Sequence, residues 1–326
     1  MYKLQIKLIL IIFIALAVPS WATEQVRFGV IGSGAKKTLN SLWLPLLKDM
    51  EKGISIPVKA VIFDDYGGTV TALKEGKIDL AWMGNKLAIE AVDNADAEIF
   101  AQIKNMLGVP GYYSMLIAHK DKPFRNEHDV MSNSSELYFG FGDVHSTSGT
   151  TVPKYYLFTQ LGYDYFNFRN IRHANHETNF HDVASGKLDV ATISSVWIQR
   201  MKERYPEQYN NIKVIWTSPL IPSDPLVWRK ELDGDIKDKI KQFLFNYAQP
   251  VKGKKSEILK HEKKILSGIK WSGFLPSSNS QLKYIRILYL FGEMESIKKD
   301  PELTEEERQS KTTEIQDQIK LLESGN

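Results

Sequence analysis

Apolar and polar positions along this chain alternate between short strand-like runs and longer stretches with helical spacing. The strand-like runs end in turns rich in glycine or aspartate, and the helical stretches carry apolar residues on one face. This order predicts strand–helix–strand units, and therefore an α/β fold with mostly parallel sheets. The predicted strands cover residues 26–31, 58–63, 80–83, 112–118, 138–142 and 214–216, and the clearest helices cover 39–52, 87–93 and 150–161. A further helix begins near Thr304, which forms a capping box with Glu307, and we expect it to pack on the outside of a first lobe.

One seven-residue pattern occurs twice in the chain. Residues 75–81 (EGKIDLA) recur as 185–191 (SGKLDVA), so that Gly76 and Gly186 lie 110 residues apart. In each copy, apolar residues predict a short helix that ends at the glycine and leads into a buried strand. Ten residues before each glycine, at the start of the helix, stands Tyr66 or His176. Because a helix start favours an anion, the repeat predicts two lobes that share an anion-binding cleft. The alternative is a chance match between two ordinary α/β units.

The N-terminus has the layout of a secretory signal peptide. Lys3 and Lys7 precede an apolar run over residues 8–18, and small residues flank Trp21 up to an expected cleavage after Ala22. The run is too short to span a bilayer, although an uncleaved anchor is the weaker alternative. With no cysteine, the chain has neither a lipid-modified N-terminal Cys nor a disulfide framework. These features predict residues 1–22 as signal peptide and a periplasmic protein with no stable membrane insertion after cleavage.

Composition excludes some classes of partner. The chain has 326 residues and a formal charge of +3, which falls to +1 when Lys3 and Lys7 leave with the signal peptide. A nearly neutral chain gives no support for nucleic-acid binding or for a polybasic membrane contact. The length after residue 22 suits two α/β lobes or one large domain.

The segment with the most chemistry is Gly142–Gly149, between a predicted strand and a predicted helix. Ser146, Thr147, Ser148 and Gly149 stand together there, and such a helix start can direct several O–H and N–H donors at one tetrahedral oxyanion. The simpler interpretation is a loop whose hydroxyls only cap their own helix. The segment lacks the Gly-Lys-Ser/Thr ending of a nucleotide-binding P-loop.

His173, His176, Glu177 and His181 raise the question of a metal site. Their spacing does not match the zinc-protease helix, because the fourth residue after His176 is Phe180. The clearer role for His176 is to donate a ring N–H to a phosphoryl oxygen. We therefore predict no metal and no cofactor.

Taken together, these motifs resemble a known family. The segments Asp65-Tyr66, Trp82–Asn85, Pro110–Tyr112, Ser146–Gly149, His176–Asn179 and Ser218–Pro225 occur in the order and spacing of the phosphonate-binding proteins of ABC transporters. These proteins belong to the phosphate/phosphite/phosphonate substrate-binding family, and the resemblance covers essentially the whole chain after the signal peptide.

The resemblance implies a two-lobed periplasmic binding protein of type II, with two hinge crossovers and a ligand cleft between the lobes. It places lobe 1 over residues 23–118 plus 218–326 and lobe 2 over 119–217. It also implies a phosphorus oxyanion as ligand and an ABC permease in the inner membrane as partner. The implied ligand-binding residues are Tyr66, Tyr112, Ser146, Thr147, Ser148, Gly149, His176 and Asp224.

The sequence departs from the family pattern where the organic substituent would lie. Members that bind aminoalkylphosphonates use two carboxylates for the ammonium group, and this chain matches one with Asp224 but has Val196 at the other position. Two alternative functions stay open on the same scaffold. One is a phosphoryl-ester hydrolase with Ser146 as nucleophile and His176 as base, and the other is a ligand sensor for a membrane kinase.

Overall fold

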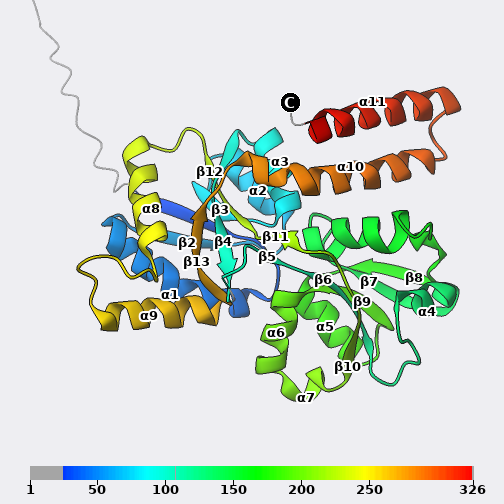
Figure 1. The fold of residues 1–326 in the computed structure, drawn as a ribbon, viewed down its shortest axis with the longest axis horizontal. Helices are drawn as coiled ribbons and strands as arrows, with labels where there is room; N and C mark the ends of the chain where they lie inside the picture. Colours follow the sequence, from blue (N-terminus) through cyan, green and yellow to red (C-terminus); the bar gives the residue numbers. More distant parts are fainter. Residues whose placement is uncertain (1–24, 107, 325–326) are drawn as a thin grey trace, which may run out of the picture.

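The computed structural model describes residues 25–106 and 108–324, so the predicted signal peptide lies outside the described residues. Within these residues the strands form a six-stranded sheet, a five-stranded sheet and a two-stranded ribbon. Figure 1 shows the two larger sheets in separate lobes that lie side by side. The expectation of a two-lobed α/β protein is therefore confirmed.

The first lobe is built on the six-stranded sheet. In spatial order its strands are β13 (Trp271–Pro276), β4 (Ala97–Asn105), β12 (Pro225–Arg229), β3 (Leu80–Trp82), β1 (Val26–Val30) and β2 (Val58–Ile62). The helices of this lobe are α1 (Lys36–Ile54), α2 (Gly67–Lys74), α3 (Asn85–Asn94), α8 (Gly234–Asn246) and α9 (Ser256–Gly268).

The second lobe is built on the five-stranded sheet. Its strands in spatial order are β10 (Ile212–Thr217), β6 (Ser114–His119), β9 (Val190–Ser194), β7 (Tyr138–Phe141) and β8 (Asn170–His173). Its helices are α4 (Glu127–Ser132), α5 (His176–Ala184), α6 (Ser195–Arg204) and α7 (Pro206–Tyr209), with short turns η1 (Ser134–Glu136) and η4 (Tyr165–Asn167) and the wider helical segments η2 (Thr147–Thr151) and η3 (Lys154–Thr159).

The expected predominance of parallel strands is wrong. Parallel pairing is confined to β2-β1-β3 in the first sheet and β8-β7-β9 in the second. The other strands pair antiparallel, including β12 between β3 and β4 and β6 between β9 and β10. The parallel part comes from the strand–helix–strand units, whereas strands that carry the chain between lobes enter each sheet in the opposite direction.

The internal repeat folds as the sequence predicts. The helices α2 and α5 end just before Gly76 and Gly186, whose φ angles of 65° and 77° favour glycine. The shared aspartate also has one role in both copies. Asp79 accepts the backbone N–H of the second residue of β1 at 2.8 Å, and Asp189 accepts that of the first residue of β7 at 2.7 Å. Both copies therefore anchor a helix–strand turn to the neighbouring parallel strand.

Two crossovers join the lobes. The chain leaves the first sheet through β5 (Gly111–Tyr112) and returns through β11 (Ile221–Pro222). These two short strands pair antiparallel with each other. The ribbon is consistent with the expected pair of hinge crossovers.

The helix predicted from residue 150 begins earlier, at Thr147. Ser146 is its N-cap, since its Oγ accepts the Gly149 N–H at 3.0 Å. The Ser146 carbonyl then accepts the N–H groups of both Thr150 and Thr151 at 3.1 Å, which widens this first turn to π-helical winding. The hydroxyl residues therefore lie in the first turn rather than in a loop before it.

The C-terminal helices refine the expectation. The capping box of Thr304 and Glu307 is confirmed, and α11 (Glu305–Ser324) packs on α10 (Lys283–Lys298). Helix α10 follows the turn η5 (Asn279–Leu282) and contacts both α3 and η3, so it lies along both lobes (Figure 1). No helix in the described ranges is both long enough and apolar enough to cross a membrane.

Candidate functional site

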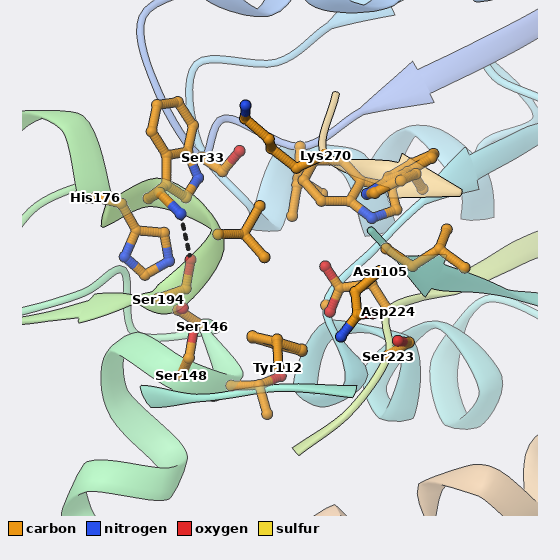
Figure 2. Close-up of a pocket in the computed structure, with 18 of the residues that line it drawn as sticks. Ser33, Asn105, Tyr112, Ser146, Ser148, His176, Ser194, Ser223, Asp224 and Lys270 are labelled. Carbon is orange, nitrogen blue, oxygen red and sulfur yellow. Dashed lines mark hydrogen bonds between the residues drawn. The ribbon is translucent and has the colours of Figure 1, made fainter. Parts of the chain in front are cut away.

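A cavity lies between the two lobes, with an empty volume of about 580 Å³ when its open mouth is included. Figure 2 shows His176, Ser146 and Ser148 on one wall, with Asp224 and Asn105 on the facing wall. The polar and charged residues of the lining are Ser33, Tyr66, Asn105, Tyr112, Ser146, Thr147, Ser148, His176, Ser194, Arg200, Ser223, Asp224 and Lys270, and the indoles of Trp82, Trp197 and Trp271 also border the cavity.

The parallel strands of both sheets explain why these side chains meet. Ser33 follows β1, Tyr66 follows β2, Ser146 follows β7, and His176 follows β8. The carboxyl ends of parallel strands lie at one edge of a sheet, and in such sheets ligands bind beyond that edge. The two lobes turn these edges toward each other across the cavity.

Ser146, Thr147 and Ser148 are each only 2% exposed. The Ser146 Oγ accepts the Gly149 N–H, so this hydroxyl caps its own helix, as the simpler interpretation of the segment predicts. The Tyr66 hydroxyl of the other lobe lies close to it, and this contact opposes the rise in the tyrosine pKa that burial causes. The hydroxyl of Ser148 faces that of Tyr112, which leaves two serine hydroxyls on the cavity wall.

Gly149 has a different place from the one expected, because it does not line the cavity. Its N–H donates to Ser146, and its backbone packs directly on Gly142 at the end of β7. A Cβ on Gly149 would lie 2.6 Å from the Gly142 Cα. The structure therefore gives Gly149 a packing role that holds the serine segment against the sheet.

Tyr66, Tyr112 and Asp224 line the cavity from the first lobe and the hinge. Burial raises the pKa of both tyrosines, so both keep their hydrogen and can donate it. Burial also raises the pKa of Asp224 to about 7, although the Tyr112 hydroxyl and the Trp82 N–H face the carboxylate and oppose this shift. The site thus pairs two neutral donors with a carboxyl group that ionises near neutral pH.

His176 is the first residue of α5 and is 4% exposed. Burial, helped by the charge of Arg200, lowers the pKa of its imidazole to about 3. A neutral imidazole donates one hydrogen bond and accepts another. Its Nδ1 is buried and has no hydrogen-bond partner among the described residues.

Sequence reasoning missed several residues of the lining. The Ser33 hydroxyl and the Arg200 Nε are also buried without a partner in the described part of the chain. Buried polar atoms without partners are rare in folded proteins and call for an explanation such as a bound ligand. Ser33 carried a usable signal, because it lies between two glycines directly after a predicted strand.

The residues that raised the question of a metal site do not converge. His173 Nδ1 bonds the Gly142 carbonyl at 2.8 Å, and His181 Nδ1 bonds Gln208 at 2.6 Å. Within the described ranges, no group of three His, Cys, Asp or Glu side chains is arranged to hold a metal ion.

Hydrogen bonds between the lobes show that the structure is a closed state. The Thr147 Oγ1 accepts the N–H of Lys86 at 2.9 Å, so this predicted ligand residue also bridges the lobes. Glu177 accepts the N–H of Ala35 at 2.9 Å and the hydroxyl of Thr38 at 3.1 Å. His145 bonds Glu90 at 2.9 Å, and this carboxylate raises the pKa of the imidazole.

Comparisons with known proteins agree with this geometry. The family described as "ABC transporter, phosphonate, periplasmic substrate-binding protein" matches residues 28–282. The chain belongs to this family. It is 42% identical over 311 residues to the phosphonates-binding periplasmic protein of Escherichia coli K12, with 94% of this chain and 89% of the relative covered.

Solved structures of relatives show the same fold. The binding-protein component of a phosphonate ABC transporter from Pseudomonas aeruginosa is 39% identical, with a TM-score of 0.86 over 93% of this chain and 97% of that one. A Prochlorococcus marinus protein solved with methylphosphonate is 20% identical, with a TM-score of 0.70 over 81% of this chain and 96% of that one. These matches confirm the type II periplasmic-binding-protein fold, which for the second protein is all that the likeness shows.

Proposed function

We propose that this protein captures a phosphonate, or a closely related phosphorus oxyanion, in the periplasm and delivers it to the permease of an ABC importer. The proposal rests above all on one observation: neutral donors from both lobes surround a cavity that is also lined by buried polar atoms without partners among the described residues. A tetrahedral oxyanion between Tyr66, Ser146, Ser148 and His176 would satisfy donors on both sides. Because it would contact both lobes at once, it would favour the closed state over the open one.

The lobes proposed for this closure are residues 23–118 plus 218–326 and residues 119–217. The strand membership of the two sheets supports this division, and the ribbon of β5 and β11 lies at the crossovers. The alternative of one large domain has no support in this sheet arrangement. The proposed ligand contacts are Tyr66, Tyr112, Ser146, Thr147, Ser148, His176 and Asp224.

A catalytic role is less well supported than a receptor role. A hydrolase would need the His176 ring to accept the proton of the Ser146 hydroxyl. The His176 Nδ1 has no hydrogen-bond partner among the described residues, and the strongly lowered pKa of His176 makes its ring a weak base. The family itself consists of transporter receptors, which also favours import over a sensor for a membrane kinase.

Isothermal calorimetry on ligand-stripped protein tests the proposal, with a panel of phosphonates, phosphite and phosphate measured with and without EDTA. Hydrogen bonds to a charged group contribute roughly 1.5–3 kcal/mol each, so several should give micromolar affinity or better. Binding should not change with EDTA. Absence of heat with every phosphorus oxyanion would refute the proposal.

A further inference from the structure

Two cationic side chains line the cavity beyond the phosphonate donors. Arg200 extends from α6 in the second lobe, and Lys270 follows α9 in the first lobe. They are neighbours, because the Arg200 guanidinium donates to the carbonyl of Ile269 at 2.9 Å. Figure 2 shows Lys270 on the side of the cavity away from Ser148. A ligand held by the serine segment would therefore direct its substituent toward these cations.

Arg200 is the more deeply buried of the two, with 8% of its surface exposed. Its guanidinium lies 5.0 Å from the centre of the Trp197 ring, and its Nε has no partner among the described residues. A guanidinium with free donors suits the planar, two-oxygen shape of a carboxylate. The contact with Ile269 accounts for one of its donors only.

Lys270 occupies a backbone position that normally favours glycine. Its φ angle is 65°, and it stands directly after Ile269, the C-cap of α9. This is the left-handed position that ends many helices, and glycine adopts it without steric cost. A lysine kept there against its local preference, at the edge of a ligand cavity, is typical of a functional constraint.

Carboxylates reach these two cations to different extents. No carboxylate is hydrogen-bonded to Arg200 among the described residues, although the charges of Asp224, Glu177 and Glu203 oppose the burial that lowers its pKa. Lys270 forms an ion pair with Glu203, whose side chain is 64% exposed and does not line the cavity. Glu177 is engaged with Ala35 and Thr38. Asp224 is the remaining carboxyl group of the described lining, and Val196 adds no charge beside it.

We propose that the cavity selects a phosphonate whose organic substituent ends in a carboxylate, and that Arg200 and Lys270 bind this carboxylate. The inference rests on the proposed phosphonate receptor and names its substrate class. It predicts a ligand with an anion at each end: phosphonyl oxygens in the serine segment and a carboxylate between α6 and the end of α9.

The test compares two ligands of equal carbon number by calorimetry, 3-phosphonopropionate and propylphosphonate. The protein should bind 3-phosphonopropionate at least tenfold more tightly, since charge-assisted hydrogen bonds are the stronger kind. Equal or weaker binding of 3-phosphonopropionate overturns the inference while the receptor function stands. If neither ligand nor methylphosphonate binds, the proposed function itself fails.

Two variants separate carboxylate recognition from lobe closure. Arg200→Gln should lower the affinity for 3-phosphonopropionate by tenfold or more relative to the affinity for propylphosphonate. Loss of a closure contact alone would lower both affinities by the same factor. Lys270→Gly removes the ammonium and suits the positive φ, so it should also reduce the preference without lowering the melting temperature. Arg204→Gln, at an exposed arginine of the same helix, is the matched control and should change neither affinity. If both pocket variants leave the ratio of the 3-phosphonopropionate and propylphosphonate affinities unchanged, the proposal is contradicted.

Discussion

The contact of Glu177 with the start of α1 makes closure of the lobes measurable. Helix α1 begins after Ala35, which has no side-chain cap, and its first turn contains no acidic residue. Glu177 of the other lobe supplies the missing acceptor, since its two oxygens bond the Ala35 N–H and the Thr38 hydroxyl. The carboxylate is buried, with 6% of the residue exposed. These bonds join the lobes and form only when the cleft is closed.

Glu177→Gln keeps the shape of this side chain and removes its charge. A carboxylate at a helix start contributes about 0.3–1 kcal/mol, and up to ~2 kcal/mol when partly buried. The amide also replaces one acceptor oxygen with a donor, so one of the two bonds to α1 is weakened, and a hydrogen bond to a charged group is worth about 1.5–3 kcal/mol. The neutral amide costs less to desolvate than the carboxylate, which offsets part of this loss. We therefore expect the closed state to lose roughly 1–2 kcal/mol, which corresponds to about a 5- to 30-fold weaker apparent affinity.

The decisive feature of this prediction is that the loss should be the same for every ligand. Glu177 does not line the cavity, so its replacement acts on the equilibrium between open and closed states rather than on ligand contacts. Calorimetry with methylphosphonate and a longer alkylphosphonate measures the factor by which the affinity for each ligand falls. Glu207→Gln, at an exposed position of α7, is the control. An affinity that changes less than twofold, or a loss that differs between the two ligands, refutes the reasoning.

Three further predictions concern the cavity itself. Tyr66→Phe and His176→Ala should each weaken phosphonate binding by roughly tenfold and leave the ligand-free melting temperature nearly unchanged; a sharp fall in melting temperature with intact affinity would assign a structural role instead. With Val196 in place of a second carboxylate, methylphosphonate should bind as well as or better than 2-aminoethylphosphonate, and Val196→Glu should shift the preference toward the amine; competitive titration decides this, and a clear amine preference of the unmodified protein contradicts it. Burial raises the folded-state pKa of Asp224 from 3.8 to about 7, so ionisation of this carboxyl should destabilise the folded protein as pH rises through this range. The unfolding free energy of Asp224→Asn, relative to the unmodified protein, should therefore increase between pH 4 and pH 8 by at most about 4 kcal/mol. Urea unfolding of both proteins at both pH values checks this, and a pH-independent difference would show that the carboxyl is not the titrating group.

The elements closest to the repeat could be predicted from the sequence because their signals are local. The glycines after α2 and α5 end those helices through their own backbone conformations. Tyr66 and His176 line the cavity because each stands at the start of a repeat helix, next to the carboxyl end of a strand. Such positions follow from spacing along the chain and from the general geometry of α/β units.

Other features depended on pairing between distant segments. Nothing local to Pro225–Arg229 indicates that this strand inserts antiparallel between β3 and β4, which is why the sheets are mixed rather than mostly parallel. The position of α11 likewise depends on where α10 lies, and α10 follows contacts with both lobes. A pattern of apolar residues predicts that a helix packs but does not name its partner.

Arg200 carried a local signal in its spacing from Val196. The absence of charge at Val196, taken alone, predicts a ligand substituent without charge. Four residues later on a helix, a side chain lies on the same face, so Arg200 points to the same cavity as Val196. At this wall the cavity therefore offers an apolar contact from Val196 and, one turn later, the cation of Arg200. Reading a binding position together with its helical neighbours therefore changes the expected ligand from a substituent without charge to one with a negative charge.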